Sequence, residues 1–463
     1  MSVLGDLRNH TVYSMEQAFR ANDVTTQKMR AAISTWFSLY LDHKDNDETD
    51  SSQNLPYLIV NKLVKTVFSE YECTVSAKSR KADFMREVLR STDKIRKEAM
   101  QKALIGGECL IKPNFTDSGF TITTVGRDCF IPFARDASGK LTDVGLSETT
   151  TESGIYYTLF ERRTLDESGR LTVQYKLFRS NVSTVPGSEI PLQSLPKYEA
   201  LEPVMTLPQP LSNVGMVSVK TPMFNCIDGS SDGVSVYAPA VKLIQNINRN
   251  ERQLCDEFEN GASRIIASAD MVREDASGKK KLSDKLFIGV DENPEDVGIT
   301  IFSPPLREQS YLSRKQEYLR NIESLIGMKR GILSEVEAAE RTATEITSSA
   351  GDYNLTITDF QEVWEQALRE LLSTCDALGQ MYRLCDAAPF DPETDLSVDF
   401  GDGVLFNRDK ACAEYKEMVS MGILKPELFL AWYFDLPHDK PADLQAIRDT
   451  YMPLMESLVG DGA

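Results

Sequence analysis

The side chains in this sequence that could carry chemistry are three histidines, eight cysteines and seventy carboxylates. His10, His43 and His438 stand far apart, which argues against a histidine metal centre or a histidine general base. The cysteines form no Cys-x-x-Cys pair, and a chain of 463 residues can build its core without disulfides. Reduced thiols in a cytosolic compartment are therefore indicated, and we expect no catalytic, cofactor or metal site.

Two short motifs resemble known binding sites but lack residues that those sites require. Gly278-Lys279-Lys280-Lys281 lacks the earlier glycine and the following Ser or Thr of a phosphate-binding loop. Asp399-Phe400-Gly401 mimics the magnesium motif of kinases, but no matching catalytic loop exists, so a turn at the end of a strand is the simpler interpretation. An enzyme that uses carboxylates stays open as an alternative, although no set of nucleophile, base and cofactor is visible.

The run Lys279 to Lys281 is the sharpest basic cluster of the chain. A solvated loop is the simpler interpretation, because charge runs usually face solvent. The alternative is a docking surface for an acidic partner. The sequence leaves both interpretations open.

Composition and charge set the class of protein. Hydrophobic residues make up 41% and charged residues 26%, which is ordinary for globular proteins. No apolar run approaches the roughly 18 residues of a membrane span, and the N-terminus lacks the pattern of a secretion signal. The net charge of −19 argues against binding nucleic acid through phosphate neutralisation, but it is compatible with a protein that lets DNA pass without holding it.

The N-terminal part predicts helices followed by a sheet. Apolar residues at helical spacing, such as Met29, Ile33 and Trp36, predict helices over residues 1–105. From Gly106 the pattern changes to short β-rich runs separated by turns, which predicts a mainly antiparallel sheet over 106–180. Residues 181–215 hold six of the twenty prolines, so we expect an irregular, extended surface connection there.

The middle of the chain predicts two long helices around a small insert. After Pro239, one apolar stripe continues from Ile244 to Ile265, which predicts a helix to residue 268. Residues 269–305 are β-like and rich in turn residues, and a second helix follows Pro305. Such a helical hairpin cannot bury its stripe alone, so it packs on its own chain or beside copies of itself, which can close a ring.

The C-terminal part predicts one long helix and several short elements. No proline occurs between Pro305 and Pro389, so we expect a helix from about Arg341 to Cys385 with a kink at Gly351-Asp352. Short strands over 396–400 and 404–406 and helices over 408–421 and 426–433 should follow.

Six segments of the chain stand in an order that is typical of one protein family. They are Ala32 to Tyr40, Asn61 to Glu70, Gly106 to Pro113, Pro222 to Tyr237, Arg341 to Ile346 and Gly422 to Glu427. Together they resemble the portal proteins, or head-to-tail connectors, of tailed bacteriophages, and most closely the group in long-tailed phages of Gram-positive hosts. The resemblance covers about residues 30–440.

The resemblance implies an α+β portal fold with an α/β wing, a two-helix stem, a small α/β clip, a long kinked wing helix and a short helical crown. The parts would be the wing over 1–230, the first stem helix over 231–268, the clip over 269–305, the second stem helix over 306–327, the tunnel loop over 328–341, the long wing helix and wing strands over 342–407, and the crown and C-terminal tail over 408–463.

The resemblance also implies a structural protein without cofactors rather than an enzyme. The family forms a ring, usually a dodecamer, at one capsid vertex, and DNA is packaged and ejected through its channel. Its partners would be further copies of the chain, the terminase large subunit, the head-tail adaptor, the major capsid and scaffolding proteins, and double-stranded DNA, with no membrane. The protein would be made in the bacterial cytoplasm and located in the virion. The main alternative is a cytosolic helical scaffold without a DNA channel.

The resemblance places the candidate site residues in the tunnel loop and the clip. A channel rich in Lys and Arg would trap DNA, whereas an acidic wall keeps the duplex sliding. We therefore expect three tunnel-loop acids to face or flank DNA, with sparse basic contacts and an apolar tip. These residues are the acids Glu335, Glu337 and Glu340, the bases Lys329, Arg330 and Arg341, and the tip residues Ile332 and Leu333. In the clip, Lys279, Lys280 and Lys281 would dock the partner.

Overall fold

A computed structural model of the chain describes most of its residues. The described residues are 14–41, 51–76, 79–116, 119–260, 264–267, 272–274, 280–282, 299–302, 305–335, 343–401, 408–434, 436 and 441–452. The chain forms two units, Met1–Asp399 and Phe400–Ala463. It contains both helices and antiparallel sheets, and several of the sheets have only two or three strands. This confirms the predicted α+β class.

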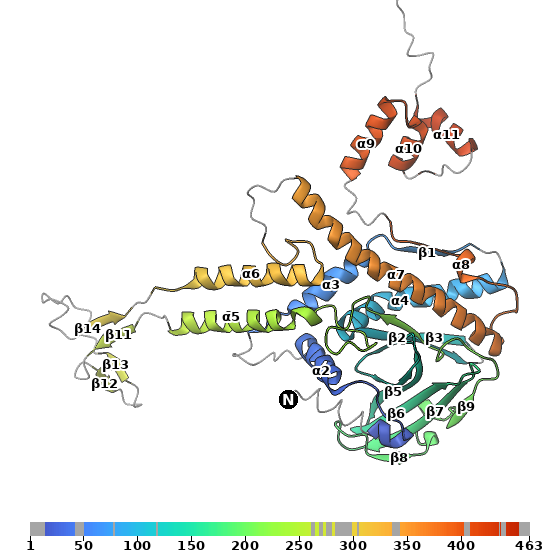
Figure 1. Cartoon of the computed structure of the whole chain (residues 1–463), viewed down its shortest axis with the longest axis horizontal. Coiled ribbons are helices and arrows are strands. Elements are labelled where there is room, and N and C mark those ends of the chain that lie inside the picture. The colour runs from blue at the N-terminus through green and yellow to red at the C-terminus, as the bar shows by residue number, and fades with distance from the viewer. Residues whose placement is uncertain are drawn as a thin grey trace, which may run out of the picture. The chain divides into compact units, whose positions relative to one another are not determined.

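Four helices pack together in the first unit (Figure 1). They are α2 (Gln27–Leu41), α3 (Leu55–Val67), α4 (Arg80–Gly106) and α7 (Ala343–Met381). Each buries an apolar face: α2 buries Met29, Ile33 and Trp36, as its spacing predicts, and α7 buries Trp364 and Leu371. The predicted helices are confirmed to within a few residues, while the kink at Gly351-Asp352 stays a prediction.

Two antiparallel sheets lie beside these helices. The smaller one has the order β10-β2-β3 and the larger one the order β4-β5-β6-β7-β8, with β9 also paired to β7. Their strands are β2 (Glu108–Thr116), β3 (Gly119–Gly126), β4 (Phe130–Arg135), β5 (Leu141–Glu152), β6 (Ile155–Leu165), β7 (Leu171–Ser180), β8 (Ser188–Ile190), β9 (Val204–Thr206) and β10 (Val217–Lys220). Helices α4 and α7 both contact the smaller sheet. The predicted sheet over 106–180 is confirmed, including the hairpin of β6 and β7.

The proline-rich connection lies mostly at the surface, as its composition predicts, but it also contains short regular elements. It forms the 3-10 turns η1 (Leu192–Ser194) and η2 (Pro196–Tyr198) besides strands β8 and β9. Leu192, Leu195 and Tyr198 form a buried cluster with side chains of β6 and β7. What the composition does not show is that the connection is anchored, because these few apolar residues pack on one face of the larger sheet while most of their neighbours stay exposed.

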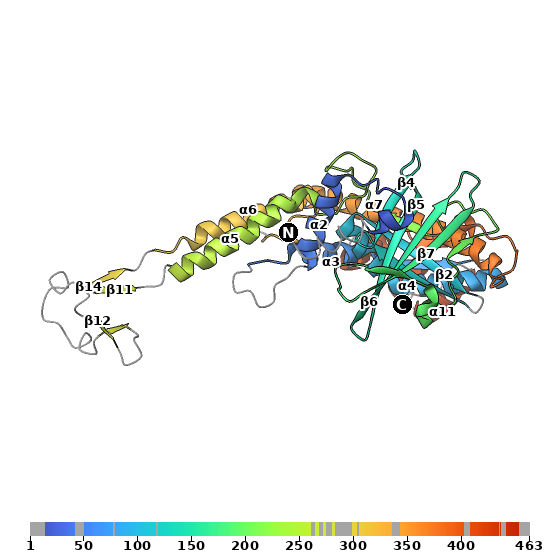
Figure 2. The same cartoon turned by 90° about the horizontal axis from the view of Figure 1, so that it is seen from below.

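The two long helices of the hairpin are α5 (Val241–Asn260) and α6 (Glu308–Ile326), which lie side by side (Figures 1 and 2). Both contact the short 3-10 turn η3 (Ala238–Ala240). The predicted continuation of the first helix to residue 268 is wrong. Helix α5 ends at Asn260, and β11 (Arg264–Ala267) pairs with β14 (Ile299–Phe302). Gly261 and the β-branched pair Ile265-Ile266 favour this break.

A second small ladder lies between β11 and β14 in the sequence: β12 (Val272–Glu274) pairs with β13 (Lys280–Leu282). A further two-stranded ladder joins distant parts of the first unit. There β1 (Glu72–Val75) pairs antiparallel with β15 (Leu396–Asp399), which follows the short helix α8 (Pro392–Asp395). The predicted strand at 404–406 lies outside the described residues.

The second unit contains α9 (Arg408–Ser420), α10 (Pro426–Phe434) and α11 (Pro441–Tyr451). The first two confirm predicted helices, whereas α11 was not predicted. Arg448 Nε on α11 donates to Glu427 Oε1 on α10 at 2.6 Å. Tyr415 and Trp432 make an edge-to-face contact between α9 and α10, with ring centroids 4.7 Å apart. None of the helices that the structure describes combines the length and the apolar character of a membrane span.

Candidate functional site

The helical pair of α5 and α6 is fixed to the helices of the first unit at its base. Tyr237, just before η3, is fully buried, and its hydroxyl donates to the backbone oxygen of Trp36 on α2 at 3.0 Å. The segment before α3 also binds the pair. Ser51 Oγ donates to the backbone oxygen of Asn248 at 2.7 Å, and Lys315 Nζ donates to Gln53 Oε1 at 3.1 Å.

Polar contacts connect the two helices along their length. Asn250 Nδ2 donates to the backbone oxygen of Tyr311 at 3.1 Å, and Lys315 Nζ lies 2.6 Å from Glu251 Oε1. Near the other end, Arg307 Nη2 lies 2.6 Å from Glu257 Oε2. Such contacts fix the register of α5 against α6. They do not bury the apolar side chains of the two helices.

The apolar stripe of the pair is buried only at its base. Ile247 and Ile322 have no exposed surface. Farther along, Phe258 is 47% exposed and Leu312 is 44% exposed. Leu325, in the last turn of α6, is 50% exposed. Large apolar side chains that stay exposed on two paired helices are typical of a surface that contacts another molecule.

The loop after α6 is organised by Glu323, a side chain without exposed surface. Its Oε1 accepts the backbone N–H groups of Gly331 at 3.1 Å, Leu333 at 2.6 Å and Ser334 at 2.9 Å. Its Oε2 accepts the Ser334 hydroxyl at 2.7 Å. The sequence did not single out Glu323, because nothing in its spacing separates it from the other acids of the helix.

The structure places five of the eight predicted tunnel-loop residues in or beside this turn. Lys329, Ile332 and Leu333 are half-buried, and Arg330 is exposed. Glu335 is exposed, and its backbone N–H donates to Gln316 Oε1 on α6 at 2.9 Å. The other three, Glu337, Glu340 and Arg341, lie outside the described residues.

The predicted basic cluster lies partly in a strand. Lys280 and Lys281 belong to β13, where they pair with Glu274 and Arg273 of β12. Lys279 lies outside the described residues. The ladder therefore places two of the three lysines in adjacent positions of one strand.

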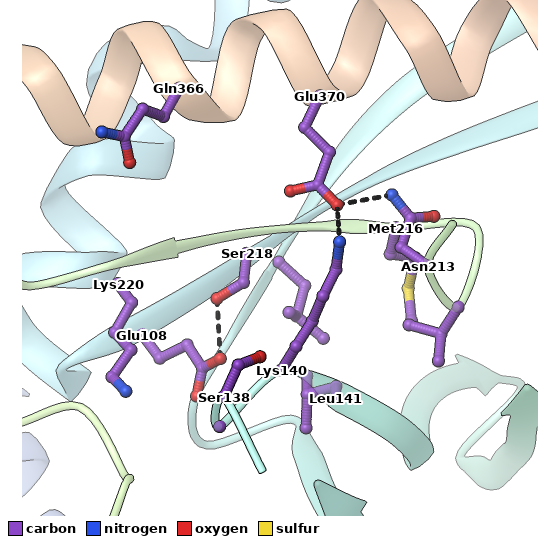
Figure 3. Close-up of a pocket in the computed structure, with 13 residues that line it drawn as sticks. Glu108, Ser138, Lys140, Leu141, Asn213, Met216, Ser218, Lys220, Gln366 and Glu370 are labelled. Carbon is purple, nitrogen blue, oxygen red and sulfur yellow. Dashed lines mark hydrogen bonds and ion pairs between the residues drawn. The ribbon is translucent and has the colours of Figure 1, made fainter. Parts of the chain in front are cut away.

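A cavity of about 340 Å³ lies between α7 and the smaller sheet (Figure 3). The four charged side chains that line it each have a partner, including Lys220, whose ammonium donates to the backbone oxygen of Ser231. Glu370 on α7 accepts from Lys140 at 2.6 Å and from Asn213 Nδ2 at 2.9 Å. Glu108 accepts from Ser218 Oγ at 2.7 Å and from Arg135 Nη2 at 2.6 Å. The contacts of Glu370 join α7 to the turn before β5 and to the segment before β10, so its carboxylate is a structural group rather than a reactive one.

The acid–base state of Glu108 agrees with that interpretation. Burial opposes its ionisation, but the guanidinium of Arg135 and the Ser218 hydroxyl hold its pKa below the usual range. A general acid or base needs a pKa near the working pH, which this carboxylate lacks. Within the described part of the chain, no three His, Cys, Asp or Glu side chains come together to hold a metal ion.

Comparison with known proteins gives the family. No curated protein matches the chain. A family model described as "Phage portal protein, SPP1 Gp6-like" matches residues 16–450, which is nearly the whole sequence. The match spans both units, the helical pair and the loop that Glu323 organises. The chain therefore belongs to the SPP1 Gp6-like phage portal proteins.

Proposed function

We propose that the chain is the subunit of a portal ring of twelve copies at one vertex of a tailed-phage capsid. DNA enters the capsid through the axial channel of this ring during packaging and leaves through it during ejection. The observation that carries the proposal is the match to the portal family over residues 16–450. The family is a structural one, so the work of DNA transport falls to a separate motor.

The helical pair supports ring formation. Leu312 and Leu325 expose large apolar surfaces on α6 in a single copy, as does Phe258 on α5. If one face of the pair contacts a different face of the next copy, the contact is heterologous and repeats until the ring closes. Such a contact would cover the side chains that the α5–α6 pairing leaves exposed. In this arrangement, α5 and α6 form the stem.

The loop after α6 supplies the proposed DNA-facing surface. Glu335 is exposed there, and Glu337 and Glu340 follow in the sequence. Acidic side chains repel the phosphate backbone, and few basic contacts mean few released counterions and little salt-dependent affinity. The net charge of −19 is in keeping with a channel that guides DNA without retaining it.

The partners follow from the parts of the portal. The β12–β13 ribbon with Lys280 and Lys281 belongs to the proposed clip, which docks the terminase large subunit and later the head-tail adaptor. The sheets and the helices packed on them form the proposed wing, which meets the major capsid and scaffolding proteins. The short helices α9 to α11 form the proposed crown.

The test is the mass and shape of the assembled protein. Twelve copies of 51.9 kDa give roughly 620 kDa for a closed ring. Mass photometry and negative-stain imaging are done on the chain alone and after co-expression with its scaffolding protein. Rings near that mass with a central hole are expected. A compact dimer or a solid assembly under both conditions would refute the portal ring and favour a helical scaffold without a DNA channel.

A further inference from the structure

One carboxylate determines how the chain leaves α6. The backbone oxygen of Glu323 accepts from the N–H groups of Gly327 and of Met328, the latter at 2.8 Å, which closes the helix. Its side chain then reaches past this end and binds the backbone of residues 331–334. A single residue thus stabilises both the end of the helix and the first turn of the following loop.

The environment of this carboxylate makes its contacts strong. It has no exposed surface, and within the described residues its oxygens are bound by backbone N–H groups and one hydroxyl rather than by Lys or Arg. Hydrogen bonds to an ionised acceptor are roughly twice as strong as neutral ones. Successive N–H groups that converge on one anion form a nest, which fixes the backbone that supplies them.

The same turn is held from its other side by α7. Gly327 has a φ of 74°, and a Cβ at this position would lie 2.5 Å from Thr356 Oγ1. The end of α6 therefore packs closely on α7, and Glu335 is additionally tied to Gln316 on α6. Residues 327–335 are held to two helices, so they follow the movements of those helices.

We infer that Glu323 is the positioning residue that anchors the first half of the proposed tunnel loop to α6. The position of the loop in the channel is then set by the stem helix α6. Glu335 is thereby held at a fixed distance from the path of the DNA. A displacement of α6 by the motor or the adaptor would move the start of the loop with it. This inference rests on the proposed portal function.

The anchor itself is tested by hydrogen–deuterium exchange on the full chain, whatever its state of assembly. In Glu323→Gln, the amides of Gly331, Leu333 and Ser334 should exchange roughly tenfold faster or more, because a neutral amide oxygen is a weaker acceptor than a carboxylate and the amide NH2 cannot accept the Ser334 hydroxyl. Glu317→Gln is the matched control, since Glu317 is exposed on the same helix. Unchanged exchange in Glu323→Gln would overturn the inference.

A milder variant covers the case in which Glu323→Gln does not fold. Ser334→Ala removes only the hydroxyl that donates to Oε2 and leaves the three N–H contacts in place. It should give a smaller increase in exchange, confined to residues 331–334. An increase spread evenly over α6 would contradict a local anchor.

The positioning role is tested in assembled particles. Glu323→Gln rings of normal mass and melting temperature should retain severalfold less DNA per particle than wild-type rings, whereas Glu317→Gln should match the wild type. Faster exchange with normal DNA content would show an anchor without a positioning role and overturn that part of the inference. If the wild-type chain forms no rings, the proposed function fails, while the exchange experiment still decides on the anchor.

Discussion

The ammonium group of Lys81 lies 2.8 Å from a carboxylate oxygen of Asp376, which joins the first turn of α4 to the last third of α7. Lys81 is 2% exposed and Asp376 is 19% exposed. The pair lies where the long helix of the chain crosses a helix formed more than 250 residues earlier. Its removal should loosen the contact between these two helices.

Breaking this pair from one side should be costly. Lys81→Ala leaves a largely buried carboxylate without its cation, so the free energy of unfolding should fall by about 3 kcal/mol. Lys81→Met combined with Asp376→Leu should recover most of that loss, because no charge is left buried. Urea unfolding followed by circular dichroism measures both.

Lys140→Ala serves as the control. It removes the more exposed pair with Glu370 and should cost about 0.5 kcal/mol. Equal losses for Lys81→Ala and this control would refute the prediction.

Gly107 and Gly233 mark a close backbone crossing between the end of α4 and the segment before α5. A Cβ on Gly107 would lie 2.3 Å from the carbonyl atoms of Gly233, and φ at Gly107 is 85°. Gly107→Ala should therefore give little soluble protein. Gly154 has a φ of 78° but no atom within 4 Å, so Gly154→Ala should cost only about 1 kcal/mol of backbone strain. Soluble yield and melting temperature compare the two, and similar behaviour would show that the crossing is not tight.

Acid should destabilise the larger sheet through Glu161. Burial opposes ionisation of this residue, but Arg163 at 2.6 Å and the ammonium of Lys112 hold its pKa below the usual range. A lowered folded pKa gives stability that is present above the unfolded value of about 4.3 and is lost as the pH falls through the folded value. Glu161→Gln should be less stable at about pH 7 and decline less steeply toward about pH 3. Melting temperatures across this range test it, and parallel curves would exclude Glu161 as a source of acid sensitivity.

The exposed leucines of α6 should matter for assembly and not for the single subunit. Leu312→Glu and Leu325→Glu should each reduce the population of rings by about tenfold at a fixed concentration, because half-exposed leucines gain further burial in a contact. The melting temperature of the subunit should not change. Ser313→Glu and Ser324→Glu place the same charge one residue away and serve as controls. Mass photometry gives the ring population, and equal effects of leucine and serine variants would argue against an apolar contact.

The acids of the proposed tunnel loop should govern how DNA slides. Replacing Glu335 and Glu337 by Lys adds phosphate contacts in every subunit, so packaging and ejection should slow at low salt and recover at high salt. Replacing both by Gln removes charge without adding a contact and should have a smaller effect. Packaging rates in assembled particles at two salt concentrations provide the measurement. Unchanged rates under both conditions would remove the electrostatic part of the proposal.

Much of the helical architecture was predictable because one periodicity dominates it. The stripes of α2 and α7 follow a single helical spacing and face a single core, so Trp36 and Trp364 are both buried as expected. Strand β5 lies inside the predicted sheet, but its second half, from Ser147 to Glu152, is polar and shows no apolar alternation, so no periodicity marks its length. The apolar stripe of α5 continues in register to Ile265 in the sequence, although the helix ends at Asn260.

The candidate site was only partly predictable. The resemblance named the loop after α6, but the residue that shapes this loop, Glu323, is one of seventy acids and has no sequence signal of its own. Its burial results from the reversal of the chain at Gly327, which brings backbone N–H groups onto the side chain. Contacts between a side chain and a backbone several residues away are set by tertiary structure and leave no periodicity in the sequence.

The ladder between β1 and β15 has a consequence for how the protein is made. Strand β1 emerges from the ribosome early, but its partner is about 320 residues farther along the chain. At roughly 5–20 residues per second, β1 waits on the order of tens of seconds for that partner. The first unit therefore completes its fold only after Leu396–Asp399 has left the ribosome. Newly made chains cannot close this ladder before then, which delays the availability of finished subunits for assembly.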